Sequence, residues 1–215
     1  MSRDSTLPDG LMQHRRPFAR TGPAGVLAAA CLALIGCEQP ERAPQFPQGT
    51  LQVRYEGANR YSGCLTACVA MAANYLLDKH VLDETIIRRE MELAGLAETR
   101  VADVKQYLKG RSLHLITLTG EIDGKPPAGL NYWVSQRGHP AICVINRQAD
   151  NPAMNHAVLV IGISRTGPLE AADTIHYLDP SSPKQVHSED RATFQANWAR
   201  GQHAMMIVVS PPRGD

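Results

Sequence analysis

Residues 64–77 constrain the fold more than any other part of this sequence. They read CLTACVAMAANYLL, so small and aliphatic side chains occur on nearly every side of the helix that they predict. A helix without a polar face has to be buried. The rest of the chain must therefore cover it, and 215 residues of 43% hydrophobic composition suffice for one domain with a packed core.

The other predicted elements are helices first and strands later. We expect helices at 83–94, 99–110, 130–136 and 190–198, the first two capped by Asp83 and Thr99. Short β-branched runs between turn residues predict strands at 113–118, 141–146, 156–163, 174–178 and 204–209. This order is typical of an α+β fold.

The first 36 residues have the features of an export signal. Arg15, Arg16 and Arg20 precede an apolar run at 24–36 that is too short to span a bilayer. The Arg15-Arg16 pair leaves both the twin-arginine and the general secretory routes open, and Met12 is an alternative start. We therefore exclude residues 1–36 from the fold.

The apolar run ends in Leu34-Ile35-Gly36-Cys37, which resembles the lipobox of bacterial lipoproteins. The resemblance implies a lipid on Cys37 and a membrane anchor, whereas an ordinary cleaved secretory signal is the alternative. Glu38 replaces the Asp that usually retains lipoproteins in the inner membrane, so we expect a periplasm-facing protein of the outer membrane. Pro and Gln residues at 37–50 predict an extended tether, which places the folded domain at 51–212.

The charge and cysteine patterns exclude some classes of function. Lys and Arg total 22 against 21 Asp and Glu, so no basic excess is present to bind nucleic acid phosphates. The cysteines form no C-x-x-C pair, and the histidines have no metal-ligand spacing. We therefore expect neither a nucleic-acid partner nor a metal or other cofactor.

Three residues in chain order suggest a nucleophilic site. Cys64 stands where a loop enters the buried helix, and the free N–H groups and positive dipole end of a helix favour the reactive thiolate. His156 opens an apolar strand, and Asp179 ends the next one. A cysteine nucleophile needs a histidine base and a group that orients the base, so these residues predict a Cys-His-Asp site.

The motifs around these residues resemble papain-like cysteine peptidases of the bacteriocin-leader-processing, or double-glycine, type. The similar segments are Gly63-Cys64-Leu65-Thr66-Ala67, Gly138-His139-Pro140, Asn155-His156-Ala157-Val158 and Leu178-Asp179-Pro180. The resemblance covers about residues 51–210 and implies a papain-like fold. It also implies that Cys64 is the nucleophile, His156 the general base and Asp179 the residue that orients the base.

One position departs from that family. The family has a Gln six residues before the nucleophile that donates to the oxyanion, and here the residue is Ala58. Losing one such donor costs about 10²–10³ in rate. We expect the neighbouring Asn59 to supply the donor, with Gln52 as the next candidate; otherwise turnover is slow.

Other residues have structural interpretations. We expect Cys68, Cys143, Trp133 and Trp198 to lie in the core. His176 is a rival base, and Asp179 before Pro180 could be only a turn former.

Three functions fit these observations. The first is a membrane-tethered cysteine peptidase that acts on an exported peptide or protein, with a secretion system as a partner. The second is a papain-like module that binds a peptide but has weak chemistry. The third is a papain-like acyl- or amidotransferase.

Overall fold

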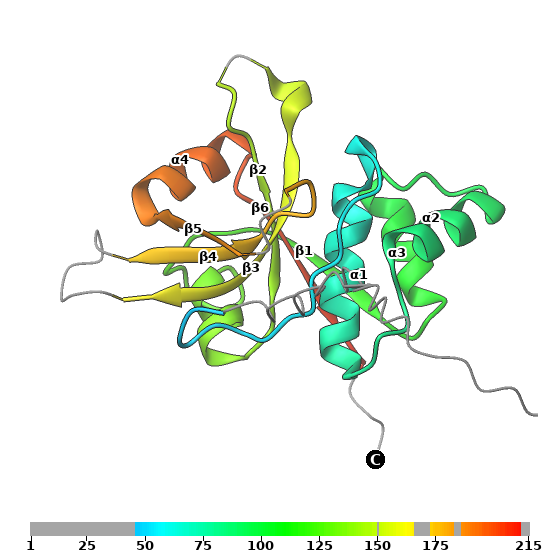
Figure 1. Cartoon of the computed structure of the whole chain (residues 1–215), viewed down its shortest axis with the longest axis horizontal. Coiled ribbons are helices and arrows are strands. Elements are labelled where there is room, and N and C mark those ends of the chain that lie inside the picture. Colours follow the sequence, from blue (N-terminus) through cyan, green and yellow to red (C-terminus); the bar gives the residue numbers. More distant parts are fainter. Residues whose placement is uncertain (1–45, 150, 166–172, 183–185, 212–215) are drawn as a thin grey trace, which may run out of the picture. The chain divides into compact units, whose positions relative to one another are not determined.

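A computed structural model describes residues 46–149, 151–165, 173–182 and 186–211. Its centre is a six-stranded antiparallel sheet in the order β1-β6-β2-β3-β4-β5 (Figure 1). The strands are β1 (His114–Thr119), β2 (Ala141–Ile145), β3 (His156–Ser164), β4 (Thr174–Leu178), β5 (His187–Asp190) and β6 (Ala204–Val209). The fold class predicted from the sequence, α+β with an antiparallel sheet, is confirmed.

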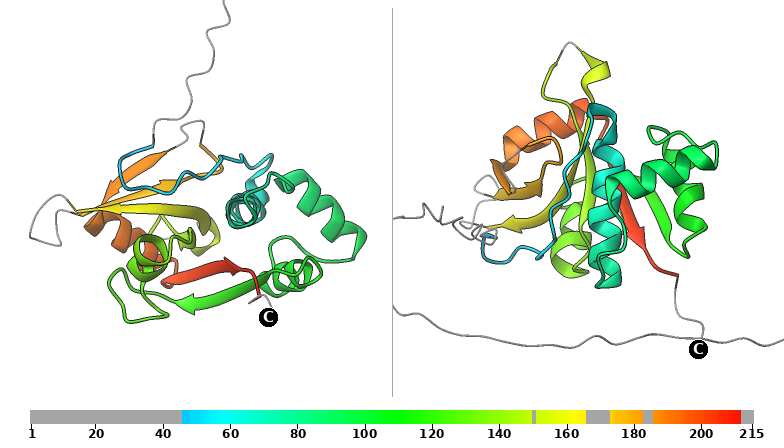
Figure 2. Two further views of the ribbon diagram at one scale, coloured as in Figure 1. Left: turned by 90° about the horizontal axis from the view of Figure 1, so that it is seen from below. Right: turned by 45° about the vertical axis from the view of Figure 1, so that its right-hand side comes forward.

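Helices cover both faces of this sheet. The helices are α1 (Cys64–Leu77), α2 (Glu84–Leu93), α3 (Val101–Lys109) and α4 (Arg191–Arg200). Figure 2 shows α1, α2 and α3 on one side of the sheet and α4 on the other. The π-helical turn η2 (Tyr132–Gln136) shares the core on the side of α4.

The sheet has a hydrophobic core on each face, one with α1 and one with α4, and these two cores explain why β3 is apolar at nearly every position. Successive side chains of a strand point to opposite faces. Leu159 packs into the core that contains α1, whereas Val158 and Val160 pack with Phe194 and Trp198 of α4. Both faces of β3 are therefore removed from water.

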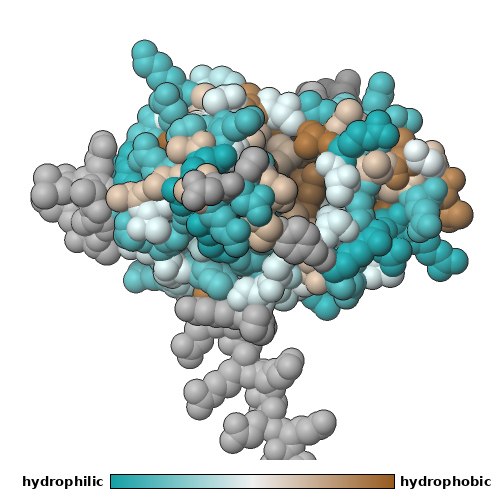
Figure 3. All heavy atoms as spheres, turned by 90° about the horizontal axis from the view of Figure 1, so that it is seen from above, coloured by the Kyte–Doolittle hydropathy of each residue, from teal (hydrophilic) through white to brown (hydrophobic). Residues whose placement is uncertain are grey.

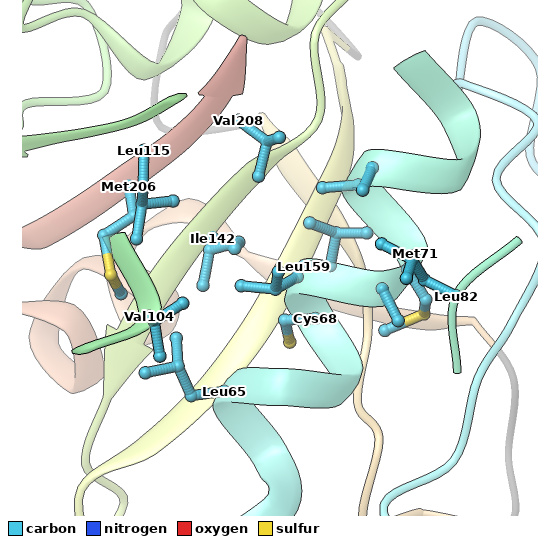
Figure 4. Packing of buried hydrophobic residues seen from close by; sticks show 14 of the residues in the cluster. Leu65, Cys68, Met71, Leu82, Val104, Leu115, Ile142, Leu159, Met206 and Val208 are labelled. Atoms are coloured by element: carbon cyan, nitrogen blue, oxygen red, sulfur yellow. The ribbon is translucent and has the colours of Figure 1, made fainter. Parts of the chain in front are cut away.

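Helix α1 is buried as its composition predicts. All residues from Leu65 to Asn74 are buried, and the helix packs mainly against β3 and β6. Figure 4 shows Leu65 and Cys68 of α1 directed toward the sheet, where Ile142 and Leu159 lie. This packing fixes the position of the helix end that begins at Cys64.

Some boundaries differ from the sequence predictions. Asp83 caps α2 by accepting from the N–H of Ile86, as expected, but the cap of α3 is Arg100 and not Thr99. Strand β5 was not predicted, because its sequence His-Ser-Glu-Asp has no apolar alternation. It pairs with β4 through backbone hydrogen bonds, which the pattern of its side chains does not predict.

The chain packs against the domain before residue 51. Phe46 contacts the core that contains α1. Thr50 packs closely on Gly162: a Cβ atom added to Gly162 would lie 2.5 Å from the Thr50 side chain. The last described residues of the expected tether, 46–50, are thus part of the packed structure. Within the described parts of the chain, no helix is long and apolar enough to cross a bilayer.

Candidate active site

Cys64 is the first residue of α1 and follows the 3-10 turn η1 (Tyr61–Gly63). Because Cys64 begins the helix, it lies at the positive end of the helix dipole, and Gly63 provides no side-chain cap for the free N–H groups there. The backbone N–H groups of Leu65 and Ala157 hydrogen-bond to its Sγ atom. Cys64 is only partly buried and lines a cavity.

His156 connects Cys64 to Asp179. Its Nε2 lies 2.6 Å from Oδ1 of Asp179, and its ring also hydrogen-bonds to Cys64. Because Nε2 faces the carboxylate, Nδ1 is the nitrogen that serves the sulfur. The packing of α1 on β3 and the pairing of β3 with β4 bring the three residues together.

The surroundings favour charge on both members of the Cys64–His156 pair. Burial raises the pKa of the Cys64 thiol, but the hydrogen bonds from His156 and Ala157 outweigh it and hold this pKa below the ordinary value. Burial lowers the pKa of His156, but the bonds to Asp179 and Cys64 outweigh it and raise this pKa to about 9. Both shifts favour the thiolate–imidazolium form of the pair over two neutral side chains.

The Asp179 carboxylate is buried and fully hydrogen-bonded. Oδ1 accepts from His156 and from the N–H of Ser181 at 3.0 Å, and Oδ2 accepts from both terminal nitrogens of Arg147 at 3.1 Å. Burial opposes its ionisation, but these donors and the positive charges hold the pKa of Asp179 well below its usual range. Asp179 is thus a fixed anion behind His156.

Arg147 was missed in the sequence. It lies shortly after β2 and belongs to no motif, so only the packing of the strands reveals its contact with Asp179.

The loop before Cys64 is anchored to the helical part of the domain. Ser62 donates to Glu98 Oε1 at 2.8 Å, and Arg60 pairs with the same carboxylate at 2.7 Å. Asn59 donates to Glu84 Oε2 at 2.7 Å and to the hydroxyl of Thr85 at 2.9 Å. These contacts hold the loop before Cys64 to α2 and to the segment before α3.

The structure does not bring Asn59 to the oxyanion position. Both amide hydrogens are committed to Glu84 and Thr85, so none remains to reach a substrate carbonyl at Cys64. Our sequence expectation for Asn59 is therefore corrected: its amide stabilises the loop. The backbone N–H of the neighbouring Ala58 donates a hydrogen bond to the carbonyl oxygen of Pro180 at 2.7 Å.

Gln52 is also remote from Cys64. It lines a small cavity with Asn74 and His80, which lie at the C-terminal end of α1. A helix of 14 residues is about 20 Å long, so Gln52 and Cys64 lie near opposite ends of it. The backbone N–H of Cys64 remains the donor that this loop offers to an oxyanion.

The residues with structural interpretations lie where they were expected. Cys68 and Cys143 are fully buried, and burial raises the pKa of both thiols. Trp133 and Trp198 are in the core. His176 has its two ring nitrogens hydrogen-bonded to Ser164 and Ser188, away from Cys64.

A cavity of about 350 Å³ lies beside the Cys64–His156 pair. Its walls are mainly apolar and include Leu65, Val101, Val144, Ala153 and Met206. Figure 3 looks onto the face where α1 begins and shows hydrophobic atoms gathered in a hollow between hydrophilic surfaces. A second cavity, of about 530 Å³, lies on the side of His156 that faces Asp179 and Arg147, and most of the residues that line it have polar or charged side chains.

No protein-family profile and no curated protein matches this chain in sequence. Thirteen solved chains match its fold, and three of them illustrate the similarity. The peptidase domain of Streptococcus ComA, a bifunctional ABC transporter of a quorum-sensing pathway, has a TM-score of 0.53 at 12% identity over 74% of this chain and 99% of that one. The chain has the fold of double-glycine peptidase domains.

The other two structures agree. A double-glycine-motif protease from an AMS/PCAT transporter, in complex with its leader peptide, has a TM-score of 0.52 at 14% identity, covering 76% of this chain and 96% of that one. A chain from Bacillus anthracis named for its likeness to C39 peptidases has a TM-score of 0.53 at 13% identity, covering 74% and 96%.

Proposed function

We propose that this protein is a cysteine peptidase that cleaves peptide bonds through Cys64, His156 and Asp179. The observation that carries the proposal is the continuous chain of hydrogen bonds from Cys64 through His156 to the buried Asp179 carboxylate. A buried structural cysteine has no need of such partners, and Cys68, one turn further along α1, has none of them. The fold of double-glycine peptidase domains supports the same conclusion.

The geometry supports an acyl-enzyme route. The Cys64 thiolate attacks the substrate carbonyl carbon, and the N–H of Cys64 and the helix dipole stabilise the oxyanion. The His156 imidazolium then gives its proton to the leaving amine as the C–N bond breaks. In the second half, neutral His156 takes a proton from water, which hydrolyses the thioester and restores the thiolate and the imidazolium.

Asp179 keeps His156 in the required orientation and tautomer. With Nε2–H held by the carboxylate, Nδ1 faces the sulfur in both halves of the reaction. Asp179 remains ionised throughout, because its four hydrogen bonds favour the anion.

The substrate that fits this cleft is a peptide with an apolar segment. The cavity beside Cys64 has mainly aliphatic walls, and a structural neighbour is in complex with a leader peptide. We propose that the substrate is an exported peptide or protein and that the enzyme meets it in the cell envelope. The sequence 34–37 suggests a lipid anchor on Cys37, periplasm-facing and in the outer membrane, with a secretion system as a partner; residue 37 lies outside the described residues.

A second function is favoured by the oxyanion position. Ala58 offers no side-chain donor and the Asn59 amide is committed to α2, so the transition state has fewer donors than in a family that uses a Gln here. A module that binds the apolar peptide segment and turns it over slowly fits this observation. The acyltransferase alternative uses the same site with an amine in place of water.

One experiment separates these functions. A fragment of residues 46–215 is incubated with a peptide library, and mass spectrometry identifies new termini, with and without an added primary amine. A peptidase gives free carboxyl termini that are absent with Cys64→Ala, whereas the matched Cys68→Ala variant retains them. Amide products with the added amine indicate a transferase. Binding of library peptides without any product supports the binding module and contradicts the peptidase.

A further inference from the structure

We propose that Arg147 is a positioning residue that fixes the Asp179 carboxylate for His156. This inference rests on the proposed Cys64–His156–Asp179 site but concerns a residue outside it. Arg147 touches neither the sulfur nor the cavity beside Cys64, and it acts through the carboxylate alone.

The two oxygens of Asp179 have separate partners. Oδ1 accepts hydrogen bonds from His156 and from the N–H of Ser181. Oδ2 accepts hydrogen bonds from both terminal nitrogens of Arg147 at 3.1 Å. A carboxylate can rotate about its last side-chain bond, and such terminal torsions are broad. With the guanidinium fork on Oδ2, rotation would break two charge-assisted hydrogen bonds, so Oδ1 stays on His156.

Arg147 is itself held in place. Its Nη2 donates to the hydroxyl of Tyr177 at 3.0 Å, and its guanidinium lies 6.0 Å from the centre of the Tyr177 ring. Tyr177 is buried in β4 and stacks on the ring of His187 at 5.3 Å. The guanidinium that binds Asp179 is therefore also anchored to β4 through Tyr177.

Removal of Arg147 would leave a buried oxygen without donors. The Asp179 side chain is only 5% exposed, and an unpaired charged group at such a depth is costly. The carboxylate would then turn toward water or take a proton, and each of these responses weakens its bond to His156. Because the imidazolium stabilises the Cys64 thiolate, the thiol would become harder to ionise.

The location of Arg147 permits a direct test by chemical rescue. Its side chain is 44% exposed and lines the polar cavity of about 530 Å³. In Arg147→Ala, free guanidinium can enter from solvent and take the place of the lost fork. If Arg147 acted only through packing of its aliphatic stem, free guanidinium would not restore the lost function.

The measured quantity is the rate of Cys64 alkylation by iodoacetamide as a function of pH, followed by mass spectrometry. In Arg147→Ala we expect the curve to move toward an ordinary thiol, with a rate at pH 6 that is lower by about tenfold for each unit of pKa. Millimolar guanidinium chloride should restore the rate, and sodium chloride of equal ionic strength should not. The matched control is Arg191→Ala, because Arg191 also pairs with carboxylates, Asp123 and Asp173, but away from the site.

Arg147→Met keeps an unbranched apolar stem in place of the Arg147 stem and provides the same alkylation test if Arg147→Ala does not fold. A wild-type alkylation curve in either folded variant would overturn the proposal, and so would an equal shift in Arg191→Ala. The readout needs no substrate. A shifted curve in a protein without peptide turnover would support the positioning role while contradicting the proposed peptidase.

Discussion

The Nε2 atom of His156 lies 2.6 Å from Oδ1 of Asp179, although 23 positions separate the two residues in the chain. The pairing of β3 with β4 creates this contact, and Arg147 from the end of β2 holds the other carboxylate oxygen. Three adjacent strands thus support the imidazole that faces Cys64. The arrangement makes the reactivity of one sulfur depend on a carboxylate that never contacts it.

Replacing Asp179 by Asn should lower kcat by about 10²-fold or more, with a smaller change in KM. The Asn amide can donate to the ring nitrogen that now faces Asp179, which favours the wrong tautomer of His156. Steady-state kinetics on a peptide identified in the library measures both constants. An Asn variant with wild-type kcat would show that His156 needs no anion.

The pH profile of kcat/KM should be bell-shaped, with its alkaline limb near the His156 pKa of about 9. The acid limb should lie below the ordinary thiol pKa, because the surroundings of Cys64 lower that pKa. In Asp179→Asn the alkaline limb should move to lower pH, since the bond that holds the imidazolium proton is lost. A profile that still rises at pH 10 would contradict the ion pair.

The same pKa shift predicts how His156 affects stability. Its pKa is raised from 6.5 to about 9 in the folded state, so its contribution is complete below pH 6.5 and is lost as the pH rises through 9. The difference in Tm between wild type and His156→Gln should therefore be largest at pH 6 and shrink toward pH 10. Thermal unfolding across this range checks the trend, and a difference that grows with pH would refute it.

The corrected role of Asn59 leads to a different expectation for the oxyanion. Asn59→Ala should reduce the free energy of unfolding by about 1–3 kcal/mol, because a buried acceptor oxygen loses its donor. Ala58→Gln should instead raise kcat, by as much as about 10²-fold, since it places an amide at the sequence position where the double-glycine peptidases that the chain resembles have their oxyanion donor. Urea unfolding and kinetics on the two variants distinguish a loop anchor from an oxyanion donor.

The sequence predicted the local parts of this structure well. The all-apolar composition of 64–77 required a buried helix, and the apolar run at 156–163 predicted the strand that the structure shows as β3. Cys64, His156 and Asp179 could be named because each stands at the end of an element with a clear pattern. The residues that link elements could not, because their partners are distant in the chain.

Arg147 and Asn59 illustrate this limit. Each lies in a polar stretch of the sequence that has no recognisable motif. Nothing in such a stretch indicates that the guanidinium of Arg147 binds Asp179 or that the amide of Asn59 binds Glu84. The neighbouring position of Asn59 suggested an oxyanion donor, but the fold turns its amide toward α2. Strand β5 was missed for a similar reason, since its backbone pairs with β4 while its side chains are polar.

The lipid anchor is tested separately from the chemistry. We expect wild type to carry a lipid on Cys37 and to fractionate with the outer membrane. Cys37→Ser should release the domain or leave an unprocessed precursor, without changing the activity of the purified domain. A wild-type protein that is soluble and carries no lipid by mass spectrometry would contradict this prediction.

The most direct test of the account is site-resolved alkylation at about pH 6. An ordinary thiol has a pKa near 8.5 and is almost fully protonated there, and Cys68 and Cys143 are buried as well. Iodoacetamide should modify Cys64 at least about tenfold faster than the other two, and His156→Gln should lower the rate at Cys64 to that of an ordinary thiol at this pH. Equal, slow modification of all three cysteines in wild type would contradict the claim that Cys64 is an activated nucleophile.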